Sequence, residues 1–134
     1  MKISVSDGTI SFPDGDINPT QGRTKFLNTS IGLAAKQKVV NDDWVHIDIE
    51  PEPGISGLII CKGERLIRVL LLMTIPSDAS DQWSTELELE RKAKHDAWLG
   101  AELGAPPYEY PWGRIASEFD QRGYVSEIIV NYAS

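Results

Sequence analysis

The stretch Trp44-Val45-His46-Ile47-Asp48-Ile49-Glu50 alternates apolar and polar side chains without a break. Successive side chains of a β-strand point to opposite faces, so this stretch predicts a strand with two different faces. The apolar face is Val45, Ile47 and Ile49, and the polar face is Trp44, His46, Asp48 and Glu50. Such alternation is typical of an antiparallel sheet with one face in the core and one face toward solvent.

The segments around this strand also favour antiparallel pairing. Alternating residues on both sides of Asp7-Gly8 predict a hairpin near the N-terminus. Residues 57–61 and 65–75 are rich in β-branched and aliphatic side chains and predict two more strands. Because residues 65–75 are apolar on both faces, we expect that strand to be central and covered on both sides. Residues 115–132 predict a last hairpin with its turn at 120–123.

Helix signals are concentrated in the second half of the chain. Ser77 and Asp78 are suitable capping residues, and Gly104 is a common stop, so we predict a long helix at about 78–103. At 100° per residue its apolar arc, which we expect to pack on the sheet, is Trp83, Leu87, Leu89, Ala93, Ala97, Trp98 and Ala101. A short helix is expected near 21–28. Together these segments predict an α+β fold in which residues 1–134 form a single two-layer domain. Its antiparallel β-sheet should have about six or seven strands, with one long helix and one short helix.

The composition excludes several classes of protein. The 134 residues carry 13 Lys and Arg against 20 Asp and Glu, a net charge of −7, which argues against direct binding to nucleic acid or to an anionic membrane. One cysteine excludes an internal disulfide framework. The longest apolar run, Val69–Met73, is far shorter than the ~20 residues of a membrane-spanning helix. Residues 1–8 hold no apolar stretch typical of a secretory signal, so we expect a cytoplasmic protein.

No known catalytic or cofactor motif occurs in the sequence, and we predict no metal, no cofactor and no catalytic residues. Asp14–Asn18 begins like a calcium loop, but Pro19 and Lys25 stand where the turn glycine and the closing glutamate are needed. Cys61 follows aliphatic residues, and we expect it in the core. His95 is expected on the solvated face of the long helix. A small hydrolytic or ligand-binding enzyme that uses His46 or His95 stays open as an alternative.

The distribution of acidic residues is more informative. Residues 39–61 hold five acids and no Lys or Arg, and residues 69–90 show the same pattern. An aromatic side chain among aligned carboxylates suits a docking surface for a basic partner, whereas an ordinary solvated sheet face would also be polar. The candidate partner-binding residues are Trp44, His46, Asp48, Glu50, Asp42 and Asp43.

Several short segments resemble a group of small bacterial proteins. They are Lys94–Leu99, Tyr110–Ser117, Phe119–Gly123 and Ile128–Tyr132, together with Ile10–Gly15. Proteins of this size and acidity include immunity proteins of polymorphic and contact-dependent toxin systems. The resemblance implies a cytoplasmic immunity protein with a basic protein partner, such as the nuclease domain of a toxin. It implies no catalytic residue. A structural homodimer paired through its sheet is a further alternative.

Overall fold

The computed structural model describes residues 1–80, 82–120 and 122–133. Its largest part is a seven-stranded sheet in the order β4-β5-β6-β7-β10-β9-β8, with every neighbouring pair antiparallel. These strands are β4 (Lys36–Asn41), β5 (Trp44–Glu52), β6 (Ile55–Lys62), β7 (Arg65–Met73), β8 (Tyr108–Tyr110), β9 (Gly113–Asp120) and β10 (Val125–Tyr132). A smaller antiparallel sheet holds β1 (Lys2–Ile3), β2 (Ile10–Phe12) and β3 (Gly15–Ile17). The α+β class and the antiparallel sheet predicted from the sequence are confirmed.

The helices are α1 (Arg23–Leu27), α2 (Ser30–Ala34) and α3 (Thr85–Leu103). The long helix ends where the sequence predicts but begins later than residue 78. Residues Pro76–Ala79 form a separate 3-10 turn, and the helix proper starts after Ser84, whose hydroxyl accepts a hydrogen bond from the Leu87 amide at 3.1 Å. A side-chain acceptor at this position satisfies one of the free amides at a helix start.

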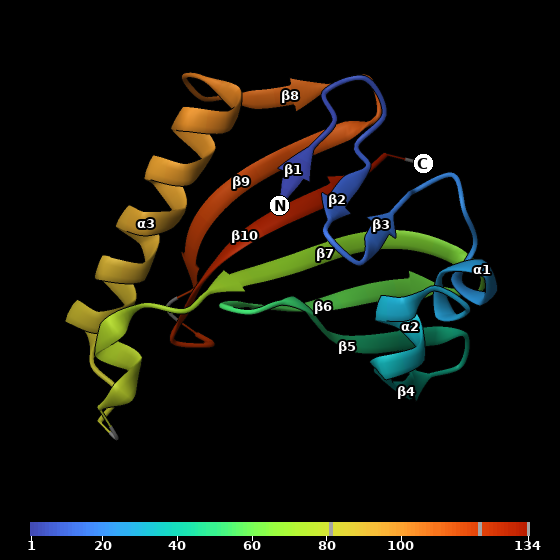
Figure 1. The fold of residues 1–134 in the computed structure, drawn as a ribbon, viewed down its shortest axis with the longest axis horizontal. Coiled ribbons are helices and arrows are strands. Elements are labelled where there is room, and N and C mark those ends of the chain that lie inside the picture. Colours follow the sequence, from blue (N-terminus) through green and yellow to red (C-terminus); the bar gives the residue numbers. More distant parts are fainter. Residues whose placement is uncertain (81, 121, 134) are drawn as a thin grey trace.

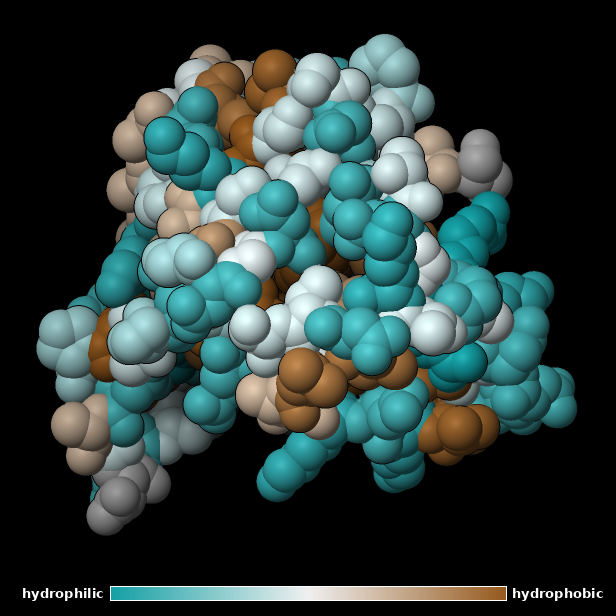
Figure 2. Space-filling view, turned by 45° about the vertical axis from the view of Figure 1, so that its right-hand side comes forward, coloured by the Kyte–Doolittle hydropathy of each residue, from teal (hydrophilic) through white to brown (hydrophobic). Residues whose placement is uncertain are grey.

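The small sheet and all three helices lie on the same side of the large sheet (Figure 1), and we call them the cover layer. The core lies between the two layers. Its fully buried side chains include Ile10, Ile17 and Phe26 from the cover layer, and Ile47, Ile59, Val69, Leu71, Ile128 and Val130 from the large sheet. Cys61 belongs to the same core and is fully buried, as the sequence predicted. Figure 2 shows one side of the molecule, where the surface is mostly hydrophilic with separate groups of hydrophobic residues.

The aliphatic strand β7 is the middle strand of the seven, as expected, but it is not covered on both faces. Val69 and Leu71 are fully buried beneath the cover layer, whereas Leu70 and Leu72, on the other face, are only half-buried. The expectation of two covering layers is therefore wrong. The second row of aliphatic side chains belongs to a face that the cover layer leaves open.

The helix α3 packs on the sheet with a different face from the one that its apolar residues predicted. Leu89 and Trp83 of the expected arc are about half exposed, and Ala93 is exposed. The buried residues of α3 are Leu87, Glu88, Arg91, His95 and Leu99. Three of these are polar, and they can be buried because the sheet and the 3-10 turn supply hydrogen-bond partners to each.

Candidate functional site

The face of the large sheet opposite the cover layer is the broadest surface with a distinct chemistry, and we call it the open face. It begins with the polar face of β5, which the sequence identified. In its four central strands the side chains of the open face are Trp44, His46, Asp48 and Glu50 of β5; Ser56, Leu58, Ile60 and Lys62 of β6; Arg68, Leu70 and Leu72 of β7; and Glu127, Ile129 and Asn131 of β10.

An aliphatic row crosses the middle of the open face. In the register of the sheet, Leu58 lies opposite Leu70, and Leu70 lies opposite Ile129. Residues directly opposite each other in an antiparallel pair have touching side chains, so the three form a continuous apolar strip over three strands. Each is half-buried by its neighbours alone. A partner that covered this strip would remove apolar surface from water, which is the main favourable term in association.

Two hollows lie along this strip. One, of about 710 Å³, is lined by Asp48 and Glu50 of β5, with Leu58, Leu70 and Leu72 behind them. The second, of about 590 Å³, extends over β10 and β9. The two hollows share Leu70 and Glu127, so they form one groove across the open face.

Carboxylates from β9 and β10 line the far end of this groove. Glu127 lies directly opposite Glu118, and Asp120 lies in the same hollow. Burial raises the pKa of Glu127, and the nearby Asp120 raises it further, while Arg68 acts in the opposite direction. Like charges placed opposite each other destabilise a sheet. Their presence at the rim of an apolar groove therefore favours a role in recognising a cation.

The sequence did not identify these β9 and β10 residues. The alternation of β10 indicates that Glu127 shares a face with Ile129, but it does not show that this face continues the polar face of β5. Only the strand order, with β7 between β6 and β10, brings Asp48 and Glu127 to the same hollow. No local pattern encodes that order.

The six predicted partner-binding residues separate into two groups. Trp44 and His46 are half-buried on the open face, and Asp48 and Glu50 are exposed there. Asp42 and Asp43 lie outside the strand, in the turn between β4 and β5.

Basic residues lie beside the predicted β5 surface. Lys36 lies opposite Asp48 and Lys38 opposite His46, and the Lys62 ammonium stands 5.6 Å from the Trp44 ring centre. The β4 side of the open face thus has mixed charge, and the hollow over β9 and β10 is lined by three acids, Glu118, Asp120 and Glu127, and two bases, Arg68 and Arg122.

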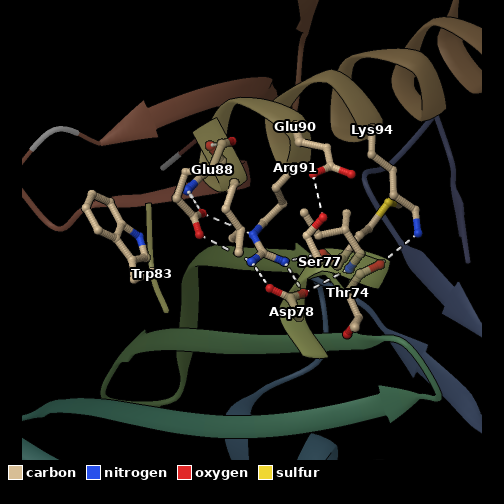
Figure 3. Close-up of polar contacts among 12 residues, drawn as sticks. Thr74, Ser77, Asp78, Trp83, Glu88, Glu90, Arg91 and Lys94 are labelled. Carbon is tan, nitrogen blue, oxygen red and sulfur yellow. Dashed lines mark hydrogen bonds and ion pairs between the residues drawn. The ribbon is translucent and has the colours of Figure 1, made fainter. Parts of the chain in front are cut away.

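In the second acidic block, residues 69–90, Glu88 is buried and Asp78 is paired with Arg91, whereas Glu86 and Glu90 are exposed. Arg91 lies between Glu88 and Asp78 (Figure 3), with its Nη1 2.8 Å from Asp78 Oδ2 and its Nε 3.0 Å from Glu88 Oε1. Its Nη1 also donates to the Met73 carbonyl, and the Ser126 amide donates to Glu88. Hydrogen bonding to Arg91 holds the pKa of Asp78 below its usual value. Asp81 of this block lies outside the described residues.

The two histidines and the cysteine do not converge. His46 lies on the open face, whereas His95 and Cys61 are fully buried on the other side of the sheet. The expected solvated position of His95 is wrong, since its Nε2 accepts a hydrogen bond from the Met73 amide at 3.0 Å. Burial raises the pKa of the Cys61 thiol to about 11, which disfavours the reactive thiolate. Within residues 1–80, 82–120 and 122–133, no three His, Cys, Asp or Glu side chains are placed to hold a metal ion.

In comparisons with known proteins, no family model matches the chain, and neither a curated protein nor a solved structure matches it. No helix in the described part of the chain is long and apolar enough to cross a membrane. The case for a function therefore depends on the chemistry of the open face.

Proposed function

We propose that this chain is a protein-binding module whose open face docks on a basic domain of another protein. The observation that carries the proposal is the uncovered aliphatic row Leu58–Leu70–Ile129, set in a groove with carboxylates at its rim. An apolar centre within a charged rim is the usual anatomy of a protein interface. The resemblance to immunity proteins favours a toxin as the partner, and the groove would then occlude the toxin's basic substrate-binding surface.

The charge of the open face favours a basic partner in particular. Asp48 and Glu50 stand at one end of the groove, Glu118 and Asp120 stand at the other, and Glu127 lies where the two hollows meet. The chain as a whole carries a charge of −7. Opposite charges on two surfaces raise the association rate and select the partner more than they raise the final affinity. Dissociation should instead depend on the apolar row, because buried hydrophobic contacts hold a complex together once it has formed.

The proposal is tested by kinetics against the protein encoded by the reading frame adjacent to the gene of this chain. We expect Asp48→Lys with Glu50→Lys to lower the association rate constant by about tenfold at low salt, with a smaller effect at high salt. Leu70→Ala should act mainly on the dissociation rate. The matched control is Asp16→Lys with Glu102→Lys, which changes the charge equally at exposed positions of the cover layer.

Three results would contradict the proposal. The first is the absence of a complex between the two purified proteins. The second is a complex whose rates are equal for the open-face variants and the control. The third is a wild-type chain that forms a stable homodimer through the open face, because that face would then serve self-association. Urea unfolding of each variant separates a loss of binding from a loss of folding.

A further inference from the structure

The strand β9 has an outer edge that is only partly paired. On its inner side it pairs with β10 along its whole length, from Gly113 to Asp120. On its outer side β8 pairs only with Gly113, Arg114 and Ile115. From Ala116 onward, the described part of the chain supplies no strand and no other backbone hydrogen bond to that edge.

The sequence explains why the pairing stops there. The chain that precedes Tyr108 is Pro106-Pro107, and proline has no amide hydrogen to donate to a ladder. The segment therefore leaves the sheet and joins the end of α3 instead of continuing β8 along β9. The edge of β9 from Ala116 onward is therefore free because Pro106 and Pro107 keep the chain before Tyr108 out of the sheet.

A groove runs beside the free edge. It has a volume of about 790 Å³ and lies between β9 and the second half of α3. The wall on α3 includes Asp96, Leu99 and Gly100, and the wall on β9 includes Ala116, Ser117 and Glu118. A cleft between a helix and an unpaired strand edge has the form that peptide-binding domains use for strand addition.

The charges of the groove indicate which peptide would fit. Lys92 is paired with Asp96 at 3.0 Å, and Arg114 lies opposite Glu109 in the register of the sheet. Glu118 instead lies opposite another acid, Glu127, and forms no ion pair with a described residue. A basic side chain beside Glu118 would relieve this like-charge contact.

We propose that the groove binds an extended peptide segment of a partner protein, which adds as a strand to the free edge of β9. Its backbone would bond to the edge from Ala116 to Asp120, and one of its side chains would be a Lys or Arg next to Glu118. Apolar side chains on the same segment would pack against Leu99. The proposal goes beyond the docking function of the open face, because it concerns the sheet edge beside α3. Glu118 borders both surfaces, whereas Gly100 lines only the groove beside α3, so the Gly100 variants test this proposal independently.

Gly100 provides the decisive variant. A Cβ atom built at Gly100 has open space around it, so a large side chain there would extend into the groove without a clash at its base. The probe is a displayed library of short random peptides, from which binders to the wild-type chain are selected and resynthesised. We expect selection to enrich sequences with alternating apolar residues and a Lys or Arg. Gly100→Phe should lower the binding affinity for these peptides by at least about tenfold, which corresponds to ~1.4 kcal/mol of binding free energy.

Two controls separate blocking from unfolding. Gly100→Ala keeps the groove open and should bind like the wild type, and Ala101→Phe adds the same ring at the next, exposed helix position. Glu118→Lys should lower the binding affinity for the basic peptides. It tests the proposal even if Gly100→Phe disturbs the helix. Amide hydrogen exchange should slow between Ala116 and Asp120 when a peptide is bound. The proposal is overturned if selection yields no binders, if Gly100→Phe and Glu118→Lys bind normally, or if exchange at this edge is unchanged.

Discussion

The buried polar residues of α3 explain how the helix is held on the sheet by a face whose buried apolar residues are only Leu87 and Leu99 among the described residues. Glu88, Arg91 and His95 are each almost fully buried, and each has a partner on the sheet or on the 3-10 turn. Burying a charge without a partner is far more costly than burying a paired one. These side chains therefore set the rotation of the helix, and that rotation turns Leu89 and Ala93 toward solvent.

His95 should make the stability of the protein depend on pH. The pKa of His95 is lowered to about 4, mainly by burial and in addition by the nearby Arg91, against opposing contributions from Asp96 and Glu88. The unfolded chain, with an ordinary histidine pKa of 6.5, binds a proton more readily, so stability is lost as the pH falls from 6.5 toward 4. The full effect corresponds to ~3 kcal/mol of unfolding free energy.

Urea unfolding across this pH range measures the effect. The substitution His95→Gln keeps an acceptor for the Met73 amide but does not titrate, so it should flatten the profile between pH 6.5 and 4. A wild-type profile that is flat in this window would show that His95 is not held neutral in the folded protein.

At the scale of elements, the positions of the strands could be predicted from the sequence better than the side of each element that packs in the core. The β5 alternation and the Asp7-Gly8 turn are local signals, and the structure confirms both. The face of α3 could not be predicted from its apolar residues, because the partners of Glu88 and Arg91 lie in β7, β10 and the 3-10 turn. Likewise, the apolar residues on both faces of β7 do not show whether the second face is covered by another layer or left open.

The two faces of β7 should respond differently to truncation. Leu71→Ala removes a fully buried side chain and should cost ~2–5 kcal/mol of unfolding free energy. Leu70→Ala removes a side chain that stays partly in water, so its cost should be about 1–2 kcal/mol. Urea unfolding of the two variants checks the difference. Equal costs would mean that the open face is covered in the isolated protein.

At the scale of the whole molecule, contacts between distant segments tie the small sheet to the large one. Trp112 follows β8, and its Nε1 donates to the Val5 carbonyl at 2.9 Å. The Tyr132 hydroxyl donates to the Gly8 carbonyl at 2.9 Å, and the N-terminal ammonium pairs with Glu52. Nothing in the sequence indicates that the N-terminal hairpin would be the partner of Trp112. Pairings over such distances depend on strand order, which also determined the composition of the open face.

These contacts lead to a prediction about the cooperativity of unfolding. If residues 1–134 are a single domain, as the sequence predicts, they should unfold as one unit. Cys61 lies in the core beneath the cover layer, so a thiol reagent should reach it only when that layer opens. If the chain unfolds as one unit, Cys61 labelling and tryptophan fluorescence should give the same urea midpoint.

Gly8→Ala provides a sharper test of this coupling. Gly8 has a φ of +80°, and an added Cβ would lie within 2.5 Å of the Trp112 ring, so the substitution should weaken the attachment of the hairpin. In a single cooperative unit it should lower both midpoints together, because loss of this local contact destabilises the whole fold. If Cys61 instead became reactive at urea concentrations that leave the fluorescence native, part of the cover layer would detach on its own. Residues 1–134 would then contain two units of different stability.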